Sequence, residues 1–555
     1  MENVKEKKHI LIIVIWILVL YGKSVFFSFV TDDWINIFEN IKVYSLTDIK
    51  SIFLKPQVNF GGDTYYRPLD TIYFLLCYKS FGNNPFNYHL LNIFFFLIYS
   101  VLFYKFLSMF IVQKVFAVLL TILLVSHPLM VEPVAWISAR NQILLGIFCY
   151  TILLSFHKFI EGKNKFFLVI SIISYVFSFL FHEIGVTFIF LLAFSTLFIH
   201  KKSNFNKKNF YYLIPFVLFF VIYIFFRFNL FPLKEETSIY VRLLTSLIIF
   251  KRVFLNIIFP FNLKVFYDEL KVSNNFDSDV TLSLIIFITF ILFCTINSLK
   301  DRKFLLGFVI FLFTYLPVSG VFKLIYKSLT SDRYLFLPIS GFLIMFAVFI
   351  NRNFQNWKKG TTFAILAISI IFSVKTFYRM DIWKDDLSNA IAVVEENPNN
   401  INYLNNLAVE YIKAGQLDLA EKIINSTMNI SSNSYDFIYS TLAIIEKLKG
   451  NIENAEKIYL EYLKYDKNNY RINYNLGTLY LERGEIDKAK FFLTVAYKNV
   501  NYGDLSRADI INNLGIISLI EGDKESAKKY FLEALSIKPY DKKILNNLEL
   551  ANNTK

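Results

Sequence analysis

The sequence predicts an all-α protein in two parts, a polytopic helical membrane domain followed by a polar array of helical repeats. Three observations predict this fold class. The chain has 555 residues of which 55% are hydrophobic, its apolar residues come in long blocks, and its last third is polar and repeats itself. We place the boundary at Asp381, which gives a membrane domain over 1–380 and a repeat domain over 381–555.

The apolar blocks predict about eleven membrane spans, because roughly 17–25 apolar residues cross a bilayer as one helix. The first block follows the basic KEKK and precedes no small-residue cleavage site, so we expect a retained helix. Two interrupted apolar stretches, 68–80 and 240–259, are expected to be interfacial or re-entrant helices. The predicted spans are 9–30, 87–111, 115–129, 139–159, 165–181, 184–200, 209–231, 281–298, 304–319, 334–350 and 360–378.

The distribution of lysine and arginine predicts the orientation. Residues 381–555 hold 21 Lys and Arg against 25 Asp and Glu, whereas residues 1–380 hold 37 against 19. Even numbers of predicted spans separate the basic connections at the N-terminus, 200–209, 299–303 and 351–360. Because basic loops stay cytoplasmic, we expect a multi-pass integral protein of the bacterial cytoplasmic membrane. Its N-terminus is then cytoplasmic and its repeats are extracytoplasmic.

Composition also argues against other classes of protein. The three cysteines, Cys77, Cys149 and Cys294, lie in apolar stretches and suggest neither a disulfide framework nor a metal cluster. No basic patch interleaved with aromatic residues indicates nucleic-acid binding.

The polar part shows an internal repeat with a period near 34 residues. Copies such as NLAVEYIKAGQLDLAEKII and NLGTLYLERGEIDKAKFFL carry a small residue in one helix, a glycine at the turn and an alanine in the next helix. This is the tetratricopeptide signature, in which small residues let paired helices approach closely. We expect about four repeats and a capping helix after Pro539. Such an array usually binds a peptide or protein, although it can also act as a spacer. The repeat positions are Gly415, Gly450, Gly484 and Gly522, with Ala420, Ala455, Ala489 and Ala527.

Two adjacent acids, Asp32 and Asp33, follow the first apolar block. Carboxylates at a membrane boundary are costly near lipid, which favours a functional role over a solvated helix end. Each further polar residue has a structural reading of its own, such as a helix-end hydrogen bond or an interface anchor. The predicted orientation nevertheless brings all of them to the outer face, where they favour one site. They are Arg67, His89, His127, Glu132, Arg140, His182, Glu183, Asp332 and Arg333.

These residue types suit group transfer from a phosphate. Arginine binds phosphate in bidentate fashion, and a nearby carboxylate suits a general base that deprotonates a hydroxyl. A phosphate at the lipid boundary suggests a lipid-linked donor, such as a sugar on a polyprenyl phosphate. The acids would then lie near the anomeric carbon and the basic residues near the leaving phosphate.

Six short motifs in order carry a resemblance to a known family. With the repeats that follow them, the chain resembles a bacterial relative of the transmembrane, tetratricopeptide-containing O-mannosyltransferases, within the GT-C class of polytopic glycosyltransferases. The motifs are TDDW at 31–34, YRPL at 66–69, FNYHLLN at 86–92, HPLMVEPVAWISARNQ at 127–142, HEIGVTF at 182–188 and SDRYLFLP at 331–338.

The resemblance implies transfer of a sugar, mannose in the eukaryotic relatives, from a polyprenyl-phosphate donor to a hydroxyl acceptor on the extracytoplasmic face. The repeats would position the acceptor or a partner protein. Asp32 and Asp33 carry over to the catalytic centre, one as base or both through a divalent cation; no other cofactor is implied. Relatives often carry Lys-Glu where this chain has His182-Glu183, which replaces a fixed cation by one that titrates near neutrality.

The alternative from another class is a non-catalytic, membrane-anchored repeat scaffold for envelope protein assembly. A scaffold explains the repeats but not the outward-facing polar residues, since one span would anchor it. A transporter would place its ionisable residues in mid-span along a path, whereas these gather at helix ends.

Overall fold

The computed structural model divides into two compact units, Met1–Asn389 and Ala390–Lys555. Residues 200–206 of the predicted basic connection 200–209, residues 354–357 of the connection 351–360, and Pro539 lie outside the described residues. The described residues are 2–39, 49–54, 57–58, 64–111, 113–198, 207–230, 237–268, 270, 273–322, 329–353, 358–430, 435–501, 504, 506–538 and 541–553.

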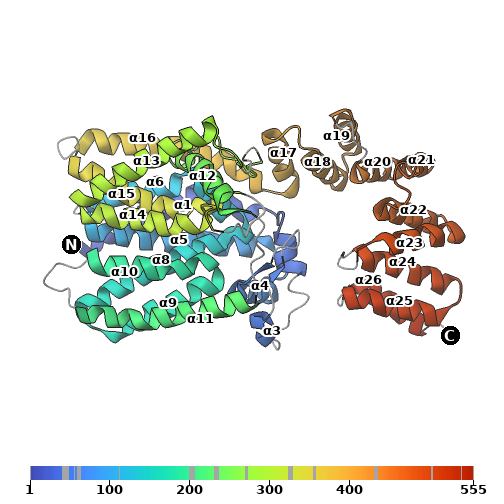
Figure 1. Ribbon diagram of the computed structural model, residues 1–555, viewed down its shortest axis with the longest axis horizontal. Helices are drawn as coiled ribbons and strands as arrows, with labels where there is room; N and C mark the ends of the chain where they lie inside the picture. The colour runs from blue at the N-terminus through green and yellow to red at the C-terminus, as the bar shows by residue number, and fades with distance from the viewer. Residues whose placement is uncertain are drawn as a thin grey trace. The chain divides into compact units, whose positions relative to one another are not determined.

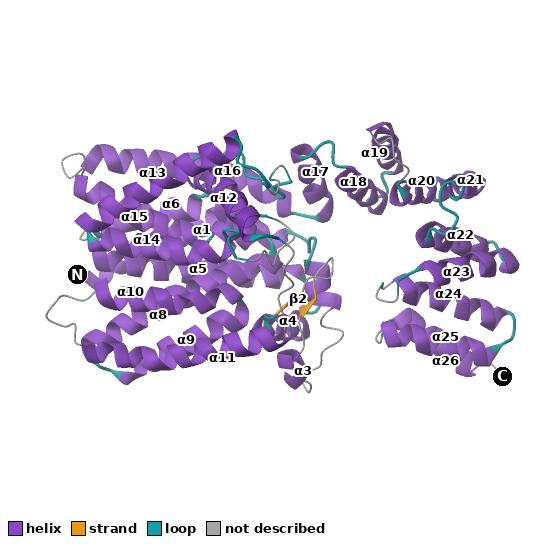
Figure 2. Ribbon diagram, in the orientation of Figure 1, coloured by secondary structure: helices purple, strands orange, loops and turns teal. Residues whose placement is uncertain are grey.

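The first unit is built of helices, with one short antiparallel pair of strands, β1 (Gln57–Val58) and β2 (Thr64–Tyr65) (Figure 2). Its helices, all but α7 labelled in Figure 1, are α1 (Glu2–Tyr21), α3 (Ile49–Leu54), α4 (Pro68–Phe81), α5 (Pro85–Phe110), α6 (Lys114–Ser126), α7 (Val131–Ala135), α8 (Asn141–Gly162), α9 (Lys165–Phe181), α10 (Phe188–Phe198), α11 (Ile214–Leu230), α12 (Ile239–Ile258), α13 (Ser278–Lys300), α14 (Arg302–Tyr315), α15 (Pro338–Asn353) and α16 (Lys358–Arg379).

Helix length supports fewer full spans than the sequence predicts. In the described part of the chain six helices are long and apolar enough to cross a membrane, or up to seven if the bent pair around His127 is one span. Other predicted spans form helices of fewer than 18 residues, such as α9 with 17, α14 with 14 and α15 with 16 residues. These apolar helices make the chain a membrane protein, while the number of crossings stays a prediction.

Close helix packing holds the first unit together. Helix α8 packs on α5 and α9, α14 packs on α15, and α6 packs on α16. Helices α14 and α15 approach so closely that a Cβ on Gly341 would lie 2.4 Å from the backbone nitrogen of Phe311. Small residues at such a crossing are what apolar helices use to bring their backbones together.

The interrupted apolar stretches also form helices, α4 and α12. The predicted basic turn at 299–303 separates α13 from α14, where the Asp301 carboxylate caps the second helix by accepting the Lys303 backbone N–H at 2.8 Å.

The first unit ends a few residues after the boundary predicted at Asp381. The reason is that residues 380–386 pack on the membrane helices. The Trp383 ring stacks on Trp136 with centroids 5.0 Å apart, and the Ser28 backbone N–H donates to the Lys384 carbonyl at 2.8 Å. Helix α17 (Asp386–Glu396) begins here.

The second unit confirms the predicted repeats. The four turn glycines have φ of +73°, +88°, +74° and +82°, the left-handed conformation that ends a first helix, and the four repeat alanines are fully buried. The helix pairs are α18 (Ile401–Lys413) with α19 (Leu417–Ile430), α20 (Asp436–Leu448) with α21 (Ile452–Tyr462), α22 (Tyr470–Glu482) with α23 (Ile486–Asn499), α24 (Ser506–Ile520) with α25 (Lys524–Ile537), followed by α26 (Lys542–Asn553).

Candidate functional site

The predicted acid pair lies in a tight turn after α1, here called the acid turn (Val30–Trp34). The Asp33 backbone N–H donates to the Val30 carbonyl at 3.0 Å, and the Asp33 Oδ2 accepts from the Val30 N–H at 3.1 Å. Between them Thr31 has φ of +50°, a left-handed conformation that costs a β-branched residue energy. The acid turn is therefore strained and depends on its contacts.

Asp33 is fully buried, and both of its carboxylate oxygens are engaged. Its Oδ1 accepts from the Ser138 backbone N–H at 2.8 Å and from the Ser138 hydroxyl at 2.5 Å. Burial raises the pKa of Asp33 to about 7, although the hydrogen bonds from Ser138 and Val30 oppose the rise. This geometry gives Asp33 the task of fastening the acid turn to the segment before α8.

Asp32 is in a different situation. It is partly exposed, and among the described residues its carboxylate accepts no hydrogen bond and forms no ion pair. Burial raises the pKa of Asp32, and the nearby charge of Arg333 lowers it. Of the two acids, Asp32 is the one whose oxygens are available to a substrate.

Arg333 is held in place by a buried acid. Its Nη1 donates to Glu132 Oε1 at 2.6 Å and its backbone N–H to Glu132 Oε2 at 3.1 Å, while the Ser331 hydroxyl donates to Oε1 at 3.0 Å. The Glu132 side chain is 1% exposed and that of Arg333 is 24% exposed. The guanidinium lies over the Trp136 ring, 4.9 Å from its centroid. Glu132 and Trp136 thus hold the Arg333 guanidinium in a fixed orientation, in which it presents N–H groups.

Arg67 forms the second partly exposed cationic group. Its Nε and Nη2 donate to the two oxygens of Glu183 at 2.8 and 2.7 Å, a bidentate pair, and Nη2 lies 3.3 Å from His182 Nε2. The Gln142 side-chain nitrogen lies 2.9 Å from the same His182 atom. Arg67 is therefore oriented by α8 and by the turn after α9.

His182 is a buried residue of this cluster. Burial lowers its pKa to about 3, so it does not titrate near neutrality. A fixed cation nevertheless lies beside this pair, because the Arg67 guanidinium contacts both His182 and Glu183.

The two arginines face a common region. Burial raises the pKa of Tyr334, and the charges of both Arg333 and Arg67 lower it, so both cations act on one hydroxyl. The same two charges act on His182, and Arg333 also acts on Asp32. Asp32, Arg67, Glu183 and Arg333 are the predicted site residues that combine charge with exposure.

Two predicted site residues form buried ion pairs instead. Arg140 donates from Nη2 to Asp70 Oδ1 at 2.8 Å, and both side chains are almost fully buried. Asp332 accepts from Arg379 Nη2 at 2.7 Å and from the Tyr267 hydroxyl. Because these charges are already paired out of solvent, the structure places them beside the site as supports.

The remaining two histidines cap backbone groups. His127 Nδ1 accepts from the Leu129 N–H at 3.2 Å, and its Nε2 lies 3.1 Å from the Ile257 carbonyl. His89 Nε2 lies 3.5 Å from the Ser28 carbonyl. Both rings are buried, so they fix the segments around the acid turn rather than reach a ligand.

Sequence reasoning missed Asp386. Its Oδ1 accepts from the Thr31 backbone N–H at 2.8 Å and its Oδ2 from the Trp34 indole N–H at 2.9 Å. A signal was present, because Asp385 and Asp386 are again two adjacent acids soon after an apolar helix. Ser138, which binds Asp33, lies within the motif at 127–142, but no local pattern in the sequence pairs it with Asp33.

A cation site is not evident from ligand geometry. Within the described residues no group of three or more His, Cys, Asp or Glu side chains could hold a metal ion. The acid pair offers two carboxylates, of which that of Asp33 already accepts three hydrogen bonds. The divalent cation at Asp32 and Asp33 stays a prediction.

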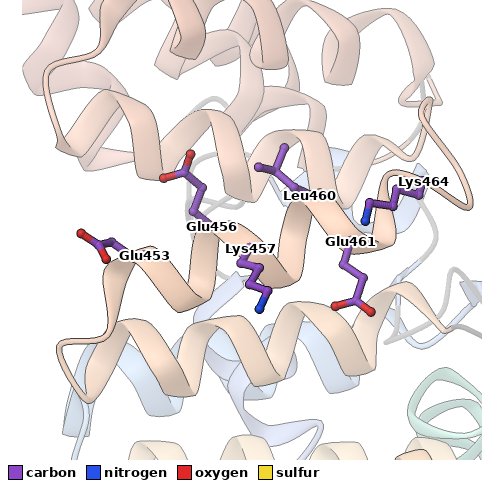
Figure 3. Close-up of a pocket in the computed structure, with 6 residues that line it drawn as sticks. All are labelled: Glu453, Glu456, Lys457, Leu460, Glu461 and Lys464. Atoms are coloured by element: carbon purple, nitrogen blue, oxygen red, sulfur yellow. The ribbon is translucent and has the colours of Figure 1, made fainter.

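A surface hollow of about 440 Å³ lies in the second unit (Figure 3). Its lining comes from α21 and the residues just after it and mixes acidic and basic side chains, with none of the predicted site residues among them. The lining residues are Glu453, Glu456, Lys457, Leu460, Glu461 and Lys464.

Comparisons with known proteins cover both parts of the chain. Two family models described as tetratricopeptide repeat match residues 458–491 and 508–541. Human protein O-mannosyl-transferase TMTC3 is 22% identical over 99% of this chain and 70% of that protein. A protein O-mannosyl-transferase of Caenorhabditis elegans is 24% identical over 69% of this chain and 56% of its own length.

Among solved structures, a thermophilic tetratricopeptide-repeat protein of Thermus thermophilus aligns with 33% of this chain and 94% of its own, at 19% identity and a TM-score of 0.27. The chain is thus homologous over most of its length to proteins named O-mannosyl-transferases, and it carries tetratricopeptide repeats in its C-terminal unit.

Proposed function

We propose that this protein is a glycosyltransferase that moves a sugar from a polyprenyl-phosphate donor to a hydroxyl acceptor. The observation that carries the proposal is the Asp32 carboxylate, which accepts no hydrogen bond from any residue that the structure describes and lies within electrostatic range of the partly exposed Arg333. The charge of Arg333 acts together with that of Arg67 on Tyr334. The homologues' name, O-mannosyl-transferase, supports transfer of mannose.

In the proposed step, Asp32 accepts the proton of the acceptor hydroxyl as its oxygen attacks the anomeric carbon of the sugar. The new bond joins the acceptor oxygen to that carbon, and the bond from the carbon to the phosphate oxygen breaks. The leaving polyprenyl phosphate takes the bonding electron pair, and Arg333 and Arg67 stabilise its added charge. A carboxylate whose pKa is raised by burial is a stronger base than one in water.

The contacts that orient Arg67 and Arg333 support a phosphate ligand. Each guanidinium donates to a glutamate, which fixes its orientation before a donor binds. Arg333 also keeps its Nε–H without a partner in the described part of the chain, and its Nη2 contact to Tyr334 is long, at 3.5 Å. These N–H groups suit phosphate oxygens.

The position of the site supports a lipid-linked donor. The acid turn follows α1, His182 and Glu183 follow α9, and residues 380–386 follow α16, so the site gathers where apolar helices end. A phosphate attached to a membrane lipid reaches this depth without leaving the bilayer. We place this face outside the cytoplasm, since basic loops stay inside.

The repeats supply a role for a protein acceptor. Side-chain hydrogen bonds join the first helices of successive repeats, such as Asn405 with Thr441 at 2.8 Å and Ser440 with Asn475 at 3.1 Å. These bonds tie successive repeats into one continuous array, and arrays of this kind usually bind a peptide or protein, here one that carries the hydroxyl.

The test is transfer of label from polyprenyl-phosphate mannose by the purified full-length protein, with guanosine diphosphate mannose as the comparison donor. We expect label in protein, lipid or glycan acceptors from the lipid donor, and a loss of roughly a hundredfold or more in Asp32→Asn. The matched control is Asp301→Asn, which keeps a helix cap far along the chain. Equal transfer by wild type and Asp32→Asn would contradict the role of the acid, and no transfer by the wild type would favour the scaffold.

A further inference from the structure

The acid turn has two anchors, and they come from distant parts of the sequence. Asp33 fastens it through Ser138, as described above. The second anchor is Asp386, which accepts the Thr31 backbone N–H with one oxygen and the Trp34 indole N–H with the other. The two bonded residues flank the acid pair on either side.

We infer that Asp386 is a positioning residue that sets the direction of the Asp32 carboxylate relative to Arg333, an inference that rests on the proposed function. The backbone at Thr31 is strained. A threonine at φ of +50° persists only where its surroundings determine it. The Thr31 N–H points to Asp386, so that bond is one of the contacts that maintain the left-handed conformation.

The neighbouring acid shows that this arrangement is not simply a helix cap. The Asp385 carboxylate accepts the Ser388 backbone N–H at 2.7 Å and thus caps the start of α17. Asp386 stands one residue later, in the first turn, and directs both oxygens to the acid turn instead of to its own helix. The two adjacent acids therefore divide two tasks, as Asp32 and Asp33 do.

The two hydrogen bonds from Thr31 and Trp34 to Asp386, here called the clamp, are made by a firmly packed segment. Trp383 is almost fully buried and stacks on Trp136, whose ring also lies under the Arg333 guanidinium. The Lys384 carbonyl accepts the Ser28 N–H at 2.8 Å. The segment that carries Asp386 thus contacts Trp136, on which the Arg333 guanidinium lies, and Ser28, which precedes the acid turn. It can hold Asp32 and Arg333 in a constant mutual geometry.

The test uses the full-length protein and two readouts, in Asp386→Ala, Asp386→Asn and the matched control Asp385→Ala. The first readout is hydrogen exchange in a peptide over residues 28–36. We expect exchange there to rise about tenfold in Asp386→Ala and to stay at the wild-type rate in Asp385→Ala, which weakens only the cap. Unchanged exchange in Asp386→Ala would overturn the clamp, whatever reaction the protein performs.

The second readout is the kinetics of mannose transfer from polyprenyl-phosphate mannose. A displaced base lowers kcat by on the order of 100-fold with little change in donor KM, because the arginines remain in place. Asp386→Asn keeps one acceptor oxygen and should fall between wild type and Asp386→Ala. Faster exchange with wild-type kcat would overturn the positioning role, because Asp32 would then not need the clamp. An inactive wild type would refute the proposed function, while the exchange measurement still decides whether Asp386 holds the turn.

Discussion

The buried carboxyl of Asp33 predicts a particular pH dependence of stability. Burial raises its pKa to about 7 from an ordinary value of 3.8. The folded protein therefore holds the proton more tightly than the unfolded chain does. A raised pKa of this kind contributes stability that is fully present below pH 3.8 and is lost as the pH rises through about 7.

The size of the effect follows from the pKa values. Between about pH 5 and pH 8 the folded carboxyl passes through its pKa, whereas the unfolded one is already ionised. Roughly two pKa units at ~1.4 kcal/mol each amount to about 3 kcal/mol of stability lost over this interval. Asp33→Asn has no such titration. The amide oxygen of this variant can still accept hydrogen bonds from Ser138. Its NH2 group, however, faces the Val30 N–H, so two donors meet without an acceptor, which lowers the free energy of unfolding by ~1–3 kcal/mol at every pH.

The assay is thermal unfolding of the detergent-solubilised protein, followed by tryptophan fluorescence at pH values from about 5 to about 8. The midpoint temperature of unfolding of Asp33→Asn should be lower than that of the wild type at the acidic end of the range. The difference between the two midpoints should shrink by about 3 °C or more toward the alkaline end. Comparing the two proteins at each pH cancels the titration of other groups. A gap that stays constant across this range would refute the assignment of the buried, proton-binding role to Asp33.

Three further predictions concern the neighbours of the acid turn. Arg67→Lys should raise the KM for the lipid-linked sugar about tenfold in steady-state kinetics, because lysine cannot form the bidentate contact to Glu183. Gly185→Ala should lower the thermal midpoint by several degrees, since its Cβ would lie 2.4 Å from the Ser178 carbonyl carbon. His182→Asn should leave the pH dependence of transfer near neutrality unchanged, because burial lowers the pKa of His182 to about 3. A step near neutrality that disappears in this variant would contradict the reasoning.

The sequence predicts the fold well where local chemistry decides it. The repeat glycines predict four left-handed turns, and all four are present, because a glycine there is required by the backbone and not by distant contacts. Apolar blocks likewise predict the helices. The number of full spans is harder to predict, since hydropathy places the break at His182 and Glu183 but does not show whether each short apolar helix, such as α9 or α15, crosses the membrane.

The candidate site was predictable as a set of residue types but not as a division of roles. Motif position alone makes Arg140 and Arg333 equivalent, yet one is buried against Asp70 and the other is partly exposed. Adjacent acids also look alike in a sequence. Only three-dimensional contacts show that Asp33 is engaged by Ser138 while Asp32 is not. Asp33 and Ser138 are far apart in the chain, and no local sequence pattern predicts that they pair.

The central claim is that Arg333 and Arg67 receive the phosphate of a lipid-linked donor while Asp32 faces its sugar. The most direct measurement is an experimental structure of the full-length protein with polyprenyl phosphate bound. The account predicts that phosphate oxygens lie within hydrogen-bond distance of the Arg333 guanidinium, with Arg67 beside them and the Asp32 carboxylate open toward the sugar position. A phosphate bound elsewhere on the first unit, with Arg333 still engaged only by Glu132, would contradict it.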